Sequence, residues 1–259
     1  LAGRIADKLG WQYSFLIFGG VGVLWGILMI IRLDNKPAET SASAAESKPG
    51  FLDGFKTVFT TPTALVLTIG FSGLIFVISG FMTWVPAYLQ EEFGQTQAEA
   101  GFNSMFWTYV AAFIGVLLAG SLSDRLALKE SKYRMYLQAF GLLCGAVFLS
   151  FMGGDSSLAI VYCCFAGWGL FRAFFDANTY SVLYDVTPER LHASCASVMG
   201  MTGFAVWSFA PLILGCIKQS MGSLNSTFPI LAIIWVGCGI LMFVVAKISY
   251  KRDREHVRN

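Results

Sequence analysis

Two oppositely charged residues lie inside a long apolar stretch of this 259-residue sequence. Arg172 and Asp176 are four residues apart, so in a helix their side chains share one face. In the middle of a membrane each such charge costs about 2.5 to 3.5 kcal/mol, whereas a strongly apolar residue contributes only about 0.3 to 0.6 kcal/mol. Beside an aqueous cavity, the Arg172 guanidinium can bind an anionic group while the Asp176 carboxylate takes up or releases a proton. The alternative is that the two charges neutralise each other and only fix helix packing.

Four polar or aromatic side chains extend this candidate binding set. Tyr180 lies one helical turn beyond Asp176 and continues the same face. Trp84 and Tyr88 lie near the end of an earlier apolar stretch, where aromatic side chains either anchor a helix at the membrane interface or contact a ligand. Asn103 is at the start of the next stretch and must find a polar partner inside a helix bundle. We therefore expect these four residues to bind a solute together with Arg172.

The sequence offers no pattern typical of a metal site, a prosthetic group or a catalytic centre. Its six cysteines lie in or at the edge of apolar stretches and form no Cys-x-x-Cys pair. The two histidines, His192 and His256, lie outside these stretches. Within the stretches we find neither two facing aspartates nor a serine with a histidine. We therefore expect no metal, no cofactor and no enzymatic activity.

Seven predominantly apolar stretches must position the candidate side chains. A helix needs about 20 such residues to cross a hydrocarbon layer roughly 30 Å thick. With 56% hydrophobic and only 13% charged residues, the chain also has too little polar surface for a soluble protein of its size. We predict an all-α polytopic membrane protein with seven transmembrane helices, at about residues 11–31, 62–89, 101–122, 135–153, 156–184, 193–217 and 228–246.

The Lys and Arg residues are distributed unevenly between the two sides of these helices. Arg4, Lys8 and Lys218 fall on one side, and Arg172 is inside a helix. The other fourteen of the 18 fall on the opposite side: Arg32, Lys36, Lys48, Lys56, Arg125, Lys129, Lys132, Arg134, Arg190, Lys247, Lys251, Arg252, Arg254 and Arg258. Because basic loops stay in the cytoplasm, we predict a multi-pass protein of the cell (inner or plasma) membrane with its C-terminus in the cytoplasm.

Composition divides the chain into four parts. Residues 1–32 are predicted to form an outside loop and one membrane helix, and residues 33–60 a cytoplasmic linker that begins with a polar segment. Within the linker, Phe51, Phe55 and Val58 recur at helical spacing and predict a short amphipathic helix in the headgroup layer. Residues 61–248 are predicted to form a six-helix bundle and residues 249–259 a basic cytoplasmic tail.

The turn after the third predicted helix carries a motif of the form G-x-L-x-D-R. It reads Gly120-Ser-Leu-Ser-Asp124-Arg125 and is followed by further basic residues up to Arg134. This motif resembles the cytoplasmic loop signature of the major facilitator superfamily of secondary transporters, although the compact Gly-Arg-Arg ending of that signature is absent. The resemblance implies that Gly120, Asp124, Arg125 and Arg134 belong to a gating loop.

Two further segments are similar to the same family. Residues 3–15 look like the junction between its fifth and sixth helices. Arg172-x-x-x-Asp176-x-Asn178, followed by Asp185-Val-Thr-Pro-Glu-Arg190, resembles the anion:cation symporter branch. The resemblance implies the family's sixth helix and its complete second six-helix half, with the N-terminal helices of the same protein missing as partners.

The same resemblance implies transport of a small polar solute, such as an organic anion or a sugar acid, by alternating access coupled to a proton or sodium gradient. Asp176 would then serve ion coupling. The expected partners are the solute, the coupling ion and membrane lipid, and no nucleic acid.

Two other functions remain open. An exporter of drug-like or apolar compounds from the same superfamily would suit the many Phe, Trp and Met side chains, although Arg172 favours an anion. A seven-helix receptor would have the same predicted topology. It is disfavoured because the predicted spans contain no lysine for a retinal Schiff base, and no pair of cysteines lies outside them.

Overall fold

The computed structural model describes residues 10–32, 50–153, 156–221, 225 and 227–258, and these residues contain helices but no strand. Contacts divide the chain into two units, residues 1–48 and residues 49–259. The first unit contains α2 (Trp11–Arg32), one uninterrupted helix of 22 residues.

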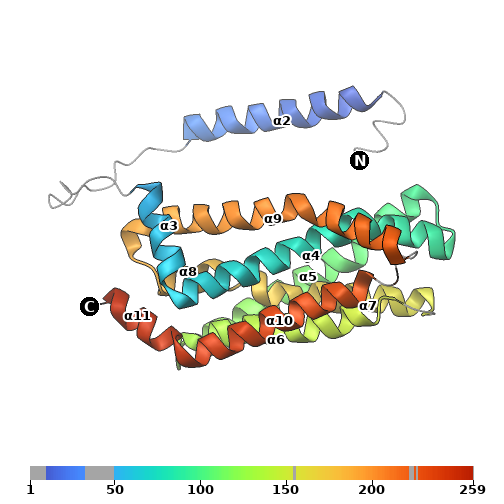
Figure 1. The fold of residues 1–259 in the computed structure, drawn as a ribbon. Coiled ribbons are helices and arrows are strands. Elements are labelled where there is room, and N and C mark those ends of the chain that lie inside the picture. The colour runs from blue at the N-terminus through green and yellow to red at the C-terminus, as the bar shows by residue number, and fades with distance from the viewer. Residues whose placement is uncertain (1–9, 33–49, 154–155, 222–224, 226, 259) are drawn as a thin grey trace. The chain divides into compact units, whose positions relative to one another are not determined.

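The second unit contains the remaining helices (Figure 1). In chain order they are α3 (Phe51–Thr60), α4 (Pro62–Phe93), α5 (Gln97–Ala127), α6 (Lys132–Ser150), α7 (Leu158–Asp176), α8 (Thr179–Asp185), the short 3-10 helix η1 (Glu189–Leu191), α9 (His192–Met221), α10 (Thr227–Ile248) and α11 (Tyr250–Arg258).

Six segments among the described residues are long and apolar enough to cross a membrane. They are Gln12–Arg32, Pro62–Phe93, Gln97–Ala127, Leu158–Asp185, Glu189–Ser220 and Thr227–Ile248. The predicted all-α fold is therefore confirmed for the described residues, with six candidate membrane helices by length and composition, whereas the predicted count of seven spans is not confirmed. The difference lies in α6, because its first turn contains Lys132 and Arg134 and only residues 135–150 of the helix follow.

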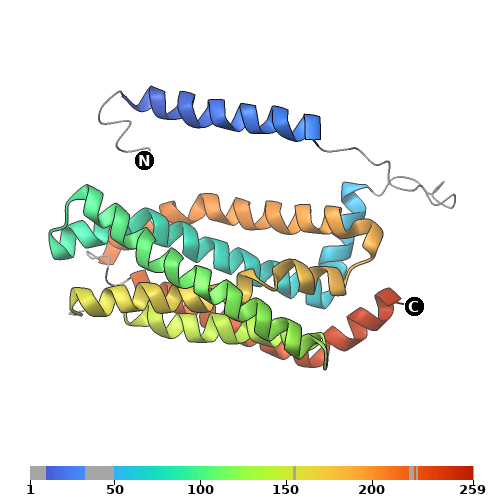
Figure 2. The ribbon, with the colours of Figure 1, turned by 180° about the vertical axis from the view of Figure 1, so that it is seen from behind.

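Within residues 49–259 the long helices run side by side (Figures 1 and 2). α5 packs on α7, α6 packs on α7 and α10, and α4 packs on α9 and α10. An aromatic stack at the centre joins α4, α7 and α10: the Phe81 and Trp168 rings lie 4.2 Å apart, and the Trp168 and Trp235 rings lie 5.8 Å apart. α7, which carries the predicted charge pair, therefore lies against the core of the bundle.

Two glycines allow α5 and α7 to approach closely. A Cβ atom on Gly169 would lie 2.2 Å from the backbone oxygen of Thr108, and one on Gly115 would lie 2.4 Å from the backbone oxygen of Leu170. Glycine at both positions lets the two backbones meet, as in other membrane helix pairs. This close contact fixes the position of α7 along the axis of α5.

α3 is a helix, as its spacing predicts, and it packs on α9. Its Gly54 and Val58 are buried, while Phe51, Phe55 and Phe59 are exposed. The Phe55 and Phe59 rings stack at 4.4 Å. One face of α3 thus contacts protein, and an apolar aromatic face remains uncovered.

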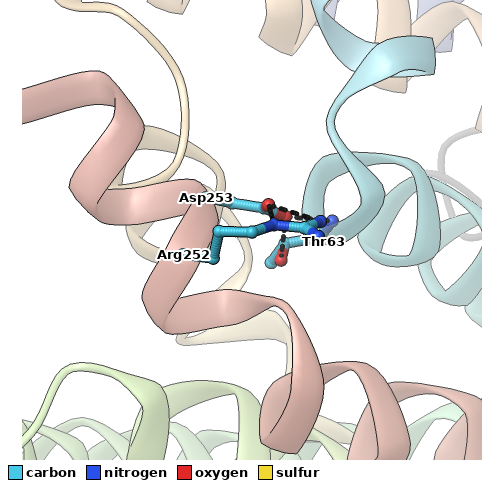
Figure 3. A network of polar contacts seen from close by, with 3 residues as sticks. All are labelled: Thr63, Arg252 and Asp253. Atoms are coloured by element: carbon cyan, nitrogen blue, oxygen red, sulfur yellow. Dashed lines mark hydrogen bonds and ion pairs between the residues drawn. The ribbon is translucent and has the colours of Figure 1, made fainter.

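The predicted basic tail is the helix α11, and it is bound to the start of α4 (Figure 3). The backbone N–H and the hydroxyl of Thr63 donate to Asp253 Oδ2 at 3.0 and 2.7 Å, and Arg252 Nη2 lies 3.2 Å from Asp253 Oδ1. Asp253 is buried and caps the first turn of α4, where backbone N–H groups lack intrahelical partners. Residues 190 positions apart are joined in this way.

Candidate functional site

Arg172 of α7 lies between two aromatic rings. Its guanidinium carbon is 5.6 Å from the centre of the Trp168 ring, one turn earlier on α7, and 5.5 Å from the Tyr109 ring of α5. A guanidinium at this distance is attracted by the electron-rich face of each ring, and the attraction grows when water is excluded. The Arg172 side chain is only 9% exposed, so the rings replace part of its hydration.

Asp176 is the ionic partner of Arg172, as the four-residue spacing predicts. Arg172 Nε lies 3.5 Å from Asp176 Oδ2. Nε is buried without a hydrogen-bond partner among the described residues, so the contact is an ion pair without good hydrogen-bond geometry. The Asp176 side chain is 37% exposed, against 9% for Arg172. The pair therefore has a buried cation and an accessible carboxylate.

The space beside Arg172 is narrow. It lies between α4, α5 and α7, is lined among others by Phe81, Thr108 and Tyr109, and is too small to admit a water molecule. Tyr109 itself is partly exposed, like Asp176. The accessible edge of the site therefore consists of Tyr109 and Asp176, and Arg172 lies behind them.

The other predicted solute-binding residues are dispersed. Asn103 of α5 donates to Gln95 Oε1 at 3.3 Å, and Gln95 donates to the hydroxyl of Tyr162 at 2.6 Å. Tyr180 of α8 is half-exposed, with its ring 6.1 Å from that of Tyr184. No contact between either predicted residue and Arg172 is found in the described part of the chain.

Trp84 and Tyr88 of α4 are bound to other parts of the bundle. Trp84 Nε1 donates to the backbone oxygen of Pro211 in α9 at 3.3 Å. Tyr88 is buried, and its hydroxyl donates to the backbone oxygen of Met152 at 2.9 Å. The structure brings together Arg172 and Asp176 from the predicted set and adds Trp168 and Tyr109.

A break in the helix follows the charge pair. α7 ends at Asp176 and α8 begins at Thr179, and the buried Asn178 lies between them. Its side-chain nitrogen donates to the backbone oxygen of Phe174 at 2.9 Å, and its side-chain oxygen accepts a hydrogen bond from Ser123. Ser123 belongs to the G-x-L-x-D-R motif, so this bond connects the motif directly to the break.

The predicted gating residues lie at one end of the bundle. Gly120, Asp124 and Arg125 are in the last turns of α5, with Asp124 and Arg125 exposed. Arg134 of α6 forms an ion pair with Asp185 at the end of α8, 3.7 Å from Nη1 to Oδ2. The G-x-L-x-D-R motif therefore lies within α5 and does not form the predicted turn. Among the predicted gating residues, Arg134 forms the ion pair with Asp185.

Tyr250 of α11 completes this ionic cluster. Its hydroxyl donates to Asp185 Oδ2 at 2.8 Å. Burial raises the pKa of Tyr250 above its ordinary value, and the neighbouring Asp185 carboxylate raises it further. The hydroxyl therefore remains protonated and holds α11 against the end of α8.

Sequence reasoning did not identify Tyr109, Ser123 or Tyr250 as site residues. Each acts across two helices, and its partner is distant in the sequence. One signal was available for Ser123, because it lies inside the recognised motif. For Tyr109 and Tyr250 the sequence has no comparable signal.

Comparison with known proteins places this geometry in a family. The family model described as "Major Facilitator Superfamily" matches residues 1–211 of the chain. The chain is 24% identical over 268 residues to the D-galactonate transporter of Escherichia coli O6:H1, covering 95% of the chain and 62% of the relative. It is 23% identical over 260 residues to an MFS-type efflux pump of Mycolicibacterium smegmatis, covering 97% of the chain and 59% of the pump.

The fold agrees with a solved structure of the same kind. A bacterial homolog of the human lysosomal transporter Spinster, in an inward-facing and occupied conformation, superposes with a TM-score of 0.65 at 17% identity. The superposition covers 95% of the chain and 59% of the homolog, so the chain spans about three fifths of the length of these proteins. The predicted family resemblance is confirmed: the chain belongs to the Major Facilitator Superfamily.

Proposed function

We propose that this chain forms part of a transporter that moves a small organic anion, of the sugar-acid kind, across a membrane by alternating access. In this proposal residues 61–248 form one six-helix bundle. α6 also crosses the membrane, so the chain has seven membrane helices when α2 is counted. α2 is the last of the N-terminal helices of the same protein, and these helices form the second bundle that alternating access needs. No enzymatic activity is involved. The exposed aromatic face of α3 lies in the headgroup layer.

The observation that carries the proposal is the asymmetry of the charge pair. A buried pair that served packing alone would need satisfied hydrogen bonds on both partners to offset the cost of removing its charges from water. Here Arg172 is buried without a hydrogen bond on Nε, while Asp176 remains accessible. The space beside Arg172 is closed in this conformation. In a conformation that opens it beside Tyr109, an anionic solute would accept hydrogen bonds from the guanidinium, and Asp176 would be free to exchange a proton or bind a sodium ion.

The gating part of the proposal rests on the end of the bundle where α3, α8 and α11 lie (Figure 1). Asp124 and Arg125 would latch one conformation there, and the Arg134–Asp185 pair would hold α8 in place. The excess of basic residues at this end supports a cytoplasmic orientation, because positive loops stay inside.

A second candidate is export of an apolar compound, which the similarity to an efflux pump favours. The two candidates differ in what Arg172 contacts. An anion importer needs the guanidinium, whereas an exporter of neutral compounds does not.

The deciding experiment uses the complete protein reconstituted in vesicles. D-Galactonate, a neutral sugar and an uncharged apolar dye are each tested for transport with an imposed proton or sodium gradient. The proposal expects gradient-dependent accumulation of the sugar acid and none of the dye. Transport of the dye without transport of any organic anion would refute it in favour of export.

A further inference from the structure

A cavity lined by basic residues lies away from the charge pair, at the end of the bundle that carries α11. Its volume is about 220 Å³, which is room for several water molecules. It is formed by the turn between α5 and α6 and by one side of α11. The lining residues are Lys129, Glu130, Ser131, Lys132, Tyr250, Lys251, Arg254 and Glu255.

The charges of this cavity do not balance. Four cations face two carboxylates, and Glu130 forms an ion pair with Lys132. Glu255 lies 4.0 Å from Lys251, at the limit of an ion pair, and the Lys251 side chain is 85% exposed. Lys129 and Arg254 form no ion pair among the described residues. An excess of about two positive charges therefore remains around a pocket that is partly open to its surroundings.

Arg254 is also incompletely satisfied. Its Nε atom is buried and has no hydrogen-bond partner in the described part of the chain. An unpaired buried donor is costly unless a ligand accepts its hydrogen bond. The cavity further lies at the first turn of α6, where no side chain caps the helix and the helix dipole favours an anion.

The position of the cavity relative to the membrane indicates which anion it would bind. α11 follows the end of the membrane segment Thr227–Ile248 by two residues, so the cavity lies at the depth of lipid headgroups. Phosphate is the anion found at that depth, and guanidinium and ammonium groups bind it well.

We propose that this cavity is a binding site for a phosphate group, held by Arg254 and Lys129. The phosphate comes either from the headgroup of an anionic lipid or from free phosphate. Binding there joins α11 to the α5–α6 turn, beside the residues assigned to gating. The site is separate from the proposed solute site at Arg172, so the two can be tested independently.

The test measures the melting temperature of the complete protein in detergent at constant ionic strength. One arm adds phosphatidylglycerol, with phosphatidylcholine as the neutral comparison, and a second arm adds inorganic phosphate without lipid. Stabilisation by phosphatidylglycerol alone identifies a lipid headgroup, and stabilisation by inorganic phosphate identifies a free ion. Stabilisation by neither overturns the site.

A double variant, Lys129→Gln with Arg254→Gln, tests the residues. Each basic residue near an anionic surface strengthens binding severalfold, so the double variant should bind the effective probe roughly tenfold more weakly. The matched control is Lys56→Gln with Lys247→Gln, which removes two exposed cations that do not line the cavity. An equal loss in the control pair would mean unspecific attraction and would overturn the proposal.

Folding is checked through the melting temperature without added probe. If the double variant is unstable, the single variant Lys129→Gln is used to test the site. Lys129 is exposed and outside any helix, so its replacement should not affect folding. Its affinity should fall several-fold relative to Lys56→Gln. Unchanged affinity in that single variant would contradict the assignment of Lys129.

Discussion

Arg172 is held by contacts that its sequence neighbours supply only in part. Trp168 and Asp176 are on its own helix, and their spacing made a common face predictable. Tyr109 comes from α5, and no sequence spacing connects it to Arg172. The charge pair could therefore be predicted from the sequence, whereas the aromatic enclosure could not, because it depends on which helices become neighbours.

Replacement of Arg172 tests the guanidinium in the complete transporter. Arg172→Lys keeps the charge but loses the planar group that stacks on rings and binds an anion with two hydrogen bonds. We expect uptake of the sugar acid to fall roughly tenfold to a hundredfold, which corresponds to about 1.5 to 3 kcal/mol for a hydrogen bond to a charged group. Initial uptake rates in vesicles measure this, with Lys56→Gln as the control. Normal uptake by Arg172→Ala would exclude the role.

Replacement of Asp176 separates coupling from binding. Asp176→Asn preserves the shape of the side chain but cannot carry a proton or attract a sodium ion. We expect gradient-driven accumulation to be lost, while exchange of labelled for unlabelled solute continues. Counterflow and net uptake are measured on the same vesicles. Undiminished accumulation under the gradient would show that the carboxylate does not couple transport.

At the scale of the helices, the sequence predicted where most membrane segments begin and end. The predicted range 62–89 lies within α4, and 228–246 lies within α10. The predicted range 156–184 covers two helices, because Asn178 turns its side chain to the α5 residue Ser123 and to a backbone oxygen. Apolar length predicts a crossing, but it carries no information about hydrogen bonds between helices.

The contact between α5 and α7 can be tested with matched glycine substitutions. Gly169→Ala places a Cβ atom 2.2 Å from the backbone oxygen of Thr108, so the helices must separate. We expect a loss of about 1 to 3 kcal/mol in stability, as for other overpacked sites. Gly101→Ala is the control, since a Cβ atom there meets nothing within 4 Å. Melting curves in detergent compare the two, and equal melting temperatures would argue against a tight contact.

The link between Ser123 and Asn178 can be tested by a double-mutant cycle. Ser123→Ala and Asn178→Ala each leave the other group buried without its partner, and each should cost about 1 to 3 kcal/mol. The double variant should cost less than the sum, because both partners are then absent. The same melting assay measures all four proteins. Strict additivity would mean that the bond contributes nothing to stability.

At the scale of the whole molecule, membership of the family explains the exposed apolar side chains. Phe113 of α5 is 68% exposed and Leu212 of α9 is 66% exposed. Such surfaces are unfavourable in water but match a lipid layer or a second helical bundle. Composition alone predicted this environment, since it needs no knowledge of the packing.

The proposed division into two bundles predicts that this chain does not transport by itself. One bundle provides one wall of a cavity, and alternating access needs two. Vesicles that contain only the 259-residue chain should accumulate no sugar acid, and coexpression with the N-terminal helices should restore uptake. Accumulation by the chain alone would contradict the proposed architecture.

The bond between Asp253 and Thr63 also affects how the chain matures during synthesis. Thr63 leaves the ribosome long before Asp253, with most of the bundle made in between. The first turn of α4 therefore stays uncapped until α11 has also been synthesised. A chain that stopped between Ile248 and Asp253 would keep all six candidate membrane segments of the described residues, and yet its α4 would lack this cap permanently.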